Sequence, residues 1–249
     1  MAHKKILIII SDADSLPLKK GGETVPKESG FFLMELAKLL SALLNVGYEV
    51  TFASPKGKIP TPDSNSESLL AFAGNFYERD REQQLIERMK KENGFASPRP
   101  FSTISKKELQ SFDGIFIPGG HAPLADLGAD SELGRILTHF HEKQKPAAAI
   151  CDGPYEFLST VKTPQGAFLY KGYKITSWSD QEEKMMEMLR GGEAHKVESA
   201  LSDAGAEMVT GLGEKFGSIT VDREVVSRGN PMAAQSLGEQ FIKMLSVKV

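Results

Sequence analysis

The chain contains one cysteine, Cys151, and the residues around it are typical of a catalytic nucleophile. Cys151 ends an apolar run that is expected to form a buried strand, and the small residues Ala149 and Gly153 stand two positions before and after it. This spacing predicts a nucleophile elbow, a strained strand-to-helix turn that exposes its central side chain at a helix N-terminus. The helix dipole and free amides would lower the pKa of a thiol there. An isolated cysteine is more often an inert core residue, and the elbow context favours the nucleophile.

A second candidate for chemistry is His121, which follows Pro118-Gly119-Gly120 at the end of a predicted strand over 113–117. Because functional sites in α/β proteins assemble beyond the carboxyl ends of the strands, His121 is the histidine expected near Cys151. The alternative is a loop histidine bonded to backbone. His139 and His141 diverge on a predicted helix and cannot bind one metal ion from one face. A single cysteine also excludes the multi-cysteine zinc patterns, so no metal site is expected.

Four segments together resemble one family. The segments 112–121 and 148–154, Glu28 ahead of the first predicted helix, and 228–231 resemble the ThiJ/PfpI superfamily. Within it, the chain is similar to the branch of glyoxalase III enzymes and heat-shock chaperones, whose fold is related to that of class I glutamine amidotransferases. The resemblance extends over residues 4–246, and the two central motifs are specific when they occur together.

The resemblance implies roles for individual residues. It implies that Cys151 is the nucleophile, that Glu28 lies beside it as a carboxylic acid bonded to the sulfur, and that backbone amides at Gly119, Gly120 and Asp152 can form an oxyanion and substrate site. A buried glutamate that faces a thiolate should have a raised pKa and stay protonated. From the residues alone, Glu28 would be an ordinary carboxylate in the first turn of a helix.

The sequence departs from this family directly after the nucleophile. The branch usually has a histidine there, which completes a Cys-His-Asp/Glu triad, whereas this chain has Asp152. A carboxylate beside the sulfur disfavours the thiolate, whereas an imidazolium would favour it. The acidic third member of the triad would be Glu183, with its neighbour Glu182 as the alternative. Without a histidine to orient, Glu183 could equally be a solvated helix residue.

The order of predicted elements indicates an α/β fold that positions these residues. The fully apolar run 6–10 predicts a central parallel strand, apolar residues from Phe32 to Leu43 recur at helical spacing, and 48–53 returns as a strand. The segments 113–117, 130–143 and 147–151 repeat this βαβ unit. We therefore expect a single three-layer sandwich, flavodoxin-like or glutamine amidotransferase-like, in which helices cover both faces of a doubly wound, mostly parallel sheet.

Further elements are expected in the C-terminal part. The pattern predicts a strand at 173–177, helices at 181–190 and 194–204, strand segments at 206–210 and 219–227, and a last helix from Pro231 with Asn230 as its cap.

Residues 55–110 interrupt the α/β pattern. Prolines surround a charged helix predicted at 78–92. We interpret this segment as an inserted lid or cap in a single domain over 1–249, with a solvated excursion as the alternative.

Composition limits the possible partners. Hydrophobic residues make up 40% of the chain, which excludes disordered and fibrous classes. Thirty Lys and Arg against thirty-three Asp and Glu give a net charge of −3, so no basic field attracts nucleic acid or anionic lipid. No apolar run approaches the roughly 20 residues that span a bilayer. A single cysteine fits a reducing cytoplasm, and the family implies a homodimer.

The resemblance implies a function as well. We expect a cysteine enzyme that converts methylglyoxal or related reactive carbonyls to 2-hydroxy acids without a cofactor, or that reverses protein glycation by the same chemistry. The loss of the usual histidine weakens this expectation. Two alternatives remain: a cysteine amidase or peptidase that passes through a thioester, and a non-catalytic holdase chaperone or redox sensor. Methylglyoxal turnover separates the first function from the others.

Overall fold

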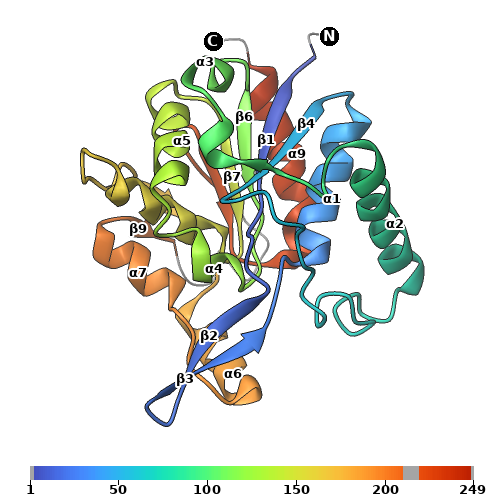
Figure 1. Cartoon of the computed structure of the whole chain (residues 1–249), viewed down its shortest axis with the longest axis vertical. Helices are drawn as coiled ribbons and strands as arrows, with labels where there is room; N and C mark the ends of the chain where they lie inside the picture. Colours follow the sequence, from blue (N-terminus) through green and yellow to red (C-terminus); the bar gives the residue numbers. More distant parts are fainter. Residues whose placement is uncertain (1–2, 210–218, 248–249) are drawn as a thin grey trace.

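In the computed structural model, which describes residues 3–209 and 219–247, a seven-stranded sheet forms the centre of the molecule (Figure 1). The strand order is β10-β11-β7-β6-β1-β4-β5, and every neighbouring pair is parallel except β10 and β11. The strands are β1 Lys5–Ile9, β4 Glu49–Ser54, β5 Arg99–Pro100, β6 Gly114–Ile117, β7 Ala147–Ile150, β10 Thr220–Asp222 and β11 Val225–Arg228. The predicted doubly wound, mostly parallel sheet is confirmed.

The central strands are apolar because both faces of the sheet are covered. In β1, Leu7 and Ile9 pack into one hydrophobic core while Ile6 and Ile8 pack into the other. Successive side chains of a strand point to opposite faces, so one continuous apolar run supplies both cores. This confirms the three-layer arrangement expected from the sequence.

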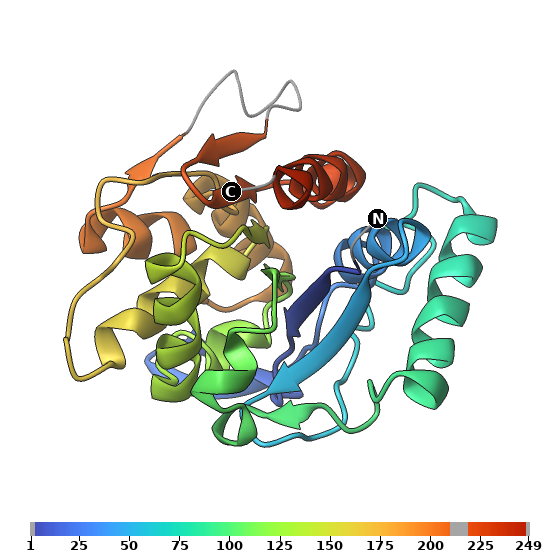
Figure 2. The ribbon, with the colours of Figure 1, turned by 90° about the horizontal axis from the view of Figure 1, so that it is seen from above.

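One face of the sheet is covered by two long helices, α1 Leu33–Asn45 and α9 Ala234–Ser246 (Figure 2). The charged helix α2 Phe76–Glu92 lies outside α1. The last helix begins as expected, since the Asn230 side chain accepts a hydrogen bond from the backbone N–H of Met232 and the short 3-10 turn η3 Pro231–Ala233 leads into α9.

The other face is covered by helices from the middle of the chain (Figure 2). They include α5 Ser131–Glu142, the 3-10 helix η2 Gly153–Lys162 that follows the cysteine, and α7 Val197–Ala204. Shorter helical pieces are η1 Phe101–Thr103, α3 Lys106–Leu109 and α4 Pro123–Asp126. Helix α6 Asp180–Arg190 lies at the end of the molecule where the parallel strands finish (Figure 1).

Three local features differ from the sequence-based expectations. The loop expected before the first helix contains an antiparallel hairpin, β2 Ser15–Lys20 with β3 Glu23–Glu28, beside α6 (Figure 1). The strand expected at 173–177 is the two-residue β8 Lys174–Ile175, which pairs with β9 Glu207–Met208 outside the main sheet. Residue 210 of the strand expected at 206–210 lies outside the described residues. The strand segment expected at 219–227 is a tight hairpin, β10 and β11.

Residues 55–110 contribute to the two cores described above. Phe72 and Phe95 are buried in the core under α1, and Phe101 is buried in the other. The hydroxyl of Ser66 accepts a hydrogen bond from the backbone N–H of Leu33, where α1 begins. The segment thus anchors the start of α1, and its role as a lid stays a prediction.

No helix among residues 3–209 and 219–247 is both long enough and apolar enough to cross a membrane.

Candidate active site

Cys151 occupies a strained turn directly after β7. Its φ angle is +58°, in the left-handed region that residues other than glycine seldom adopt. The turn is fixed on both sides, because the Cys151 N–H donates to the carbonyl of Arg228 and its own carbonyl accepts from the N–H of Trp178, each at 2.7 Å. The predicted strained turn between strand and helix is confirmed, whereas the expected exposure of its central side chain is not. The side chain is 6% exposed, and the following helix is a 3-10 helix.

The carboxyl group beside the sulfur belongs to Glu35, in the first turn of α1. Glu35 is fully buried, its carboxyl accepts the thiol hydrogen bond of Cys151, and its Oε2 accepts the Gly119 N–H at 2.9 Å. The helical periodicity of the sequence also indicates that position 35 is buried. Glu35 lies four and eight residues before Leu39 and Leu43, so helical periodicity places it on the face that α1 packs against the sheet.

The prediction that Glu28 lies beside the sulfur is wrong. Glu28 ends strand β3, where it pairs with Ser15 in the hairpin and is exposed. Helix α1 begins only at Leu33, five residues later in the chain. The physical reason is the hairpin itself, since the turn at Gly21 and Gly22 reverses the chain and keeps this carboxylate in the solvent-facing strand.

The environment of Cys151 raises the pKa of its thiol well above the ordinary value. Burial is the largest cause, followed by the carboxyl groups of Glu35 and Asp152, while the backbone N–H of Asp152 acts in the opposite direction. The expectation that the helix N-terminus would lower this pKa is therefore wrong. Desolvation and two neighbouring acids raise this pKa by more than the hydrogen bond from the Asp152 N–H lowers it.

Glu35 is itself held in the neutral form. Burial raises the pKa of Glu35 well above its usual value, and the nearby Asp152 raises it further, while hydrogen bonds from Cys151 and Gly119 act to lower it. A protonated carboxyl beside the thiol was expected, and the structure provides it at Glu35. The environment therefore favours the neutral form of both the carboxyl and the thiol.

His121 lies between two acidic side chains. Its Nε2 is 3.7 Å from Oδ2 of Asp152 and 3.5 Å from Oε2 of Glu183. Glu183 is 2% exposed, and its Oε2 also accepts the indole N–H of Trp178 at 3.2 Å. The alternative of a solvated Glu183 is thus wrong, whereas the neighbouring Glu182 forms a capping box with Ser179 at the start of α6. A histidine therefore lies beside both acidic side chains, but it comes from the loop after β6 and not from the position after Cys151.

Three backbone amides were expected to bind an oxyanion. The Gly119 amide already donates to Glu35, so it is engaged in the resting site. The Asp152 amide points at the sulfur and donates to it. Gly120 adopts φ +107°, and a Cβ there would lie 2.4 Å from the carbonyl oxygen of Gly30. Gly120 and Asp152 therefore remain the candidate oxyanion donors.

The remaining histidines form separate contacts. His141 Nδ1 lies 2.9 Å from Glu224, and His139 Nε2 lies 3.2 Å from Lys145 Nζ. Among the described parts of the chain, no group of three or more His, Cys, Asp or Glu side chains is arranged to hold a metal ion.

Comparison with protein families identifies the relationship that this geometry suggests. The profile described as ThiJ/PfpI family-like matches residues 27–186, which include Glu35, His121, Cys151 and Glu183. The chain belongs to the ThiJ/PfpI family. The similar proteins include the glutathione-independent glyoxalase hsp3101 of Schizosaccharomyces pombe, 29% identical over 225 residues, with 87% of each chain covered. Glyoxalase 3 of Candida albicans is 24% identical, covering 87% of this chain and 89% of that protein.

Solved structures of the ThiJ/PfpI family have the same fold. The crystal structure of glyoxalase III from Candida albicans superposes with a TM-score of 0.76 at 21% identity over 97% of both chains.

A shorter sequence match, 27% identical over 138 residues, is to the protein/nucleic acid deglycase HchA of Pseudomonas aeruginosa, with 53% of this chain and 46% of that protein covered. The resemblance to the glyoxalase III branch that the sequence motifs indicated is confirmed.

Proposed function

We propose that this protein is a glutathione-independent glyoxalase that converts methylglyoxal, or a related 2-oxoaldehyde, to the 2-hydroxy acid. The observation that carries the proposal is the buried contact between the Cys151 thiol and the Glu35 carboxyl at a left-handed elbow. Relatives named as glyoxalases, similar over most of the chain, support the same assignment. Deglycation is the same chemistry applied to a carbonyl adduct.

The resting geometry suggests how a neutral thiol can attack. Glu35 can accept the S–H proton on one carboxyl oxygen and deliver its own proton to the aldehyde oxygen, while the C–S bond forms. The product is a hemithioacetal, and no separate thiolate has to be stabilised in this acidic environment. The Asp152 amide donates to the sulfur in the resting site, and we assign to it and to the Gly120 amide the stabilisation of charge on that oxygen.

We assign the second proton transfer to His121, which acts as a general base. It removes the proton from the former aldehyde carbon, and the enediol that forms is protonated at the neighbouring carbon to give a thioester. Water then hydrolyses the thioester, releasing the 2-hydroxy acid and restoring the thiol. Asp152 and Glu183, at 3.7 and 3.5 Å, would stabilise the imidazolium that forms in between. The overall change is the addition of one water molecule, so no oxidant or reductant is required.

The proposal also includes expectations about the substrate, partners, location and oligomeric state. We expect a small carbonyl substrate, no nucleic-acid partner, a cytoplasmic location and a homodimer. The relatives named as glyoxalases support the small carbonyl substrate. The near-neutral charge balance supports the absence of a nucleic-acid partner, and the single cysteine supports the cytoplasmic location. The ThiJ/PfpI resemblance supports the homodimer.

The deciding experiment measures lactate formed from methylglyoxal by the purified protein without glutathione. We expect turnover that Cys151→Ala abolishes and that His121→Gln lowers by about 10²-fold or more. Thermal unfolding of each variant serves as the control for folding. Absence of lactate from the folded wild-type protein would contradict the proposal, and equal turnover by Cys151→Ala would remove the cysteine from the mechanism.

A further inference from the structure

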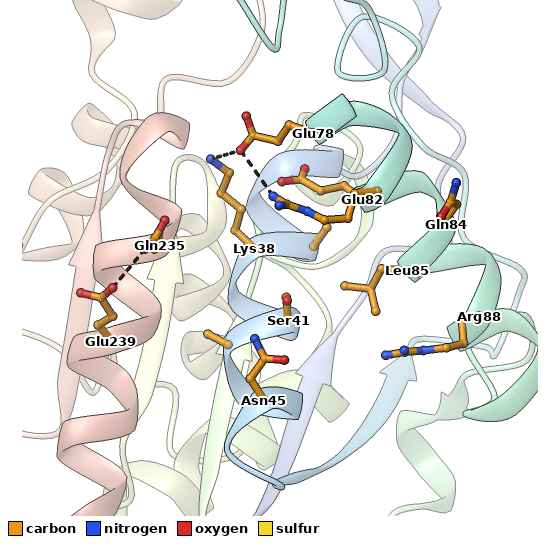
Figure 3. A pocket seen from close by; sticks show the side chains of 13 residues that line it. Lys38, Ser41, Asn45, Glu78, Glu82, Gln84, Leu85, Arg88, Gln235 and Glu239 are labelled. Carbon is orange, nitrogen blue, oxygen red and sulfur yellow. Dashed lines mark hydrogen bonds and ion pairs between the residues drawn. The ribbon is translucent and has the colours of Figure 1, made fainter. Parts of the chain in front are cut away.

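A groove of about 850 Å³ lies on the outer side of α1, between α2 and α9 (Figure 3). Its floor is formed by α1 residues that face away from the sheet, including Ser41 and Asn45, and its walls by side chains of α2 and α9. The volume is within the range of small-molecule sites in proteins. The groove is distinct from the site around Cys151, which lies at the carboxyl ends of the strands.

One acidic side chain in this groove is buried without a hydrogen-bond partner. Glu82 of α2 shares a helix face with Ile86 and Met89, points toward α1, and is 2% exposed (Figure 3). Neither of its carboxyl oxygens has a hydrogen-bond partner among the described residues. The nearest cation on α1, Lys38, is paired with Glu78 at 2.7 Å. A buried carboxyl without a hydrogen-bond partner is costly, and a donor group bound in the groove would relieve this cost.

The charges around Glu82 explain why it is neutral when the groove is empty. Burial raises the pKa of Glu82 to about 8, and Glu78 on the same helix acts in the same direction. Lys38 on α1 and Arg81 on α2 favour the ionised form but do not overcome desolvation. Across the groove, the wall of α9 presents Glu239, which accepts a hydrogen bond from Gln235. Arg88 of α2 lies further along the same groove.

We propose that this groove binds a ligand that carries a primary ammonium group on an aliphatic chain, with the ammonium against the carboxylate of Glu82. An ammonium supplies both the hydrogen bonds and the countercharge that Glu82 lacks. Ala42 and Leu85, which also line the groove, offer apolar contact to the methylene groups. A free alkylamine and the side chain of a peptide lysine share this chemistry.

The proposal has a thermodynamic signature that nonspecific binding does not share. Glu82 binds the ammonium only when ionised, so the complex lowers its pKa and binding near pH 7 releases close to one proton per site. Affinity should rise about tenfold per pH unit as the pH approaches 8 from below. It should level off above that value and fall only when the amine itself deprotonates near pH ~10.4.

The test is calorimetric titration of the full-length protein with n-butylammonium chloride near pH 7, in buffers of different ionisation enthalpy. We expect saturable binding with proton release in the wild type. Glu82→Gln, which is isosteric with the protonated acid, should lose both. The matched control is Glu87→Gln, five residues further along α2, where the glutamate side chain is exposed and pairs with Lys90. This variant should bind and release protons like the wild type.

Two additional measurements make the result unambiguous. A carboxyl carbon NMR titration of the wild type should show the pKa of Glu82 near 8 when the groove is empty and lower when it is saturated. A capped Gly-Lys-Gly peptide, compared with butylammonium, distinguishes a peptide lysine from a free amine by which of the two binds tighter. An ordinary pKa in the empty protein, or binding that Glu82→Gln leaves unchanged, would overturn the proposal.

Discussion

The reactivity of Cys151 depends on the groups around it more than on the elbow that presents it. Burial, Glu35 and Asp152 all favour the protonated thiol, and a single backbone N–H opposes them. The raised pKa disfavours the thiolate form of Cys151 in the resting site. In the mechanism that we propose, the thiol attacks as a substrate accepts a proton from Glu35, so the carboxyl and the thiol are expected to act as one unit.

Replacing Glu35 should therefore remove most of the activity. In Glu35→Gln the amide keeps the shape of the side chain but cannot pass a proton, and we expect glyoxalase turnover to fall by about 10²–10⁴-fold. Steady-state lactate formation measures this. The matched control is Glu28→Gln in the exposed hairpin, which should retain turnover within about twofold. Loss of activity in the control alone would restore the position that the sequence predicted.

Asp152 is expected to control the pKa of the thiol. Removing its charge in Asp152→Asn should lower the pKa of Cys151, because the nearby carboxyl raises it in the native protein. The pH dependence of iodoacetamide alkylation gives this pKa directly, since Cys151 is the one cysteine in the sequence. Asp203→Asn, an exposed substitution on α7, should leave the profile unchanged. An unchanged profile in Asp152→Asn would show that its carboxyl stays protonated.

The site is assembled at the scale of elements by the loops that end β6 and β7 and by the first turn of α1. The β6 loop passes so close to the chain before α1 that Gly120 faces the carbonyl of Gly30 and the backbone of Phe31 and Phe32. The same loop carries His121 and the Gly119 amide. Close packing of backbone on backbone thus sets the relative positions of the histidine, the glutamate and the cysteine.

A side chain at position 120 should disrupt this packing. We expect Gly120→Ala to lower the free energy of unfolding by at least about 2 kcal/mol, because it combines a left-handed backbone with a 2.4 Å clash. Urea denaturation provides the measurement. Gly22→Ala, also at positive φ but with no atom within 4 Å of the added Cβ, should cost only about 1 kcal/mol. Equal losses would show that strain alone acts at Gly120.

Buried acids influence the stability of the whole molecule. Glu35, Glu82, Asp126 and Glu156 all have raised pKa values, with burial as the main cause. The folded state therefore keeps protons that the unfolded chain releases above the ordinary pKa of a carboxyl. The contribution of these groups is fully present below that ordinary value and is lost as the pH rises toward the folded-state value.

Glu156 offers the clearest test of this effect. It is fully buried on η2, and both carboxyl oxygens lack a hydrogen-bond partner among the described residues. Glu156→Gln should gain stability relative to the wild type between pH ~5 and ~8, by up to about 1.4 kcal/mol per pH unit. Denaturant unfolding across this range measures the difference, and Glu23→Gln in the exposed hairpin should show no such trend. A constant difference between Glu156→Gln and the wild type would contradict a raised pKa.

The sequence by itself determined the sheet and the sharp turn at Cys151. A run of five apolar residues at 6–10 can be buried only between two layers, and small residues around Cys151 permit only a sharp turn there. Such signals are local, because they depend on side-chain volume and periodicity within a few residues. The same periodicity is consistent with Glu35 on the buried face of α1, a position that the prediction of Glu28 from the family resemblance missed.

The tertiary structure decided which ionisable side chains lie close together and which protonation state each of them favours. His121 and Glu183 are 62 residues apart in the sequence and come from the loop after β6 and from α6, yet their side chains lie 3.5 Å apart. No local pattern reveals this contact, and none reveals that desolvation exceeds the helix dipole at Cys151. The physical reason is that pKa values depend on burial and on neighbours brought together only by the fold. The sequence therefore specifies the turn that presents Cys151, while the folded chain sets the pKa of its thiol and the side chains around it.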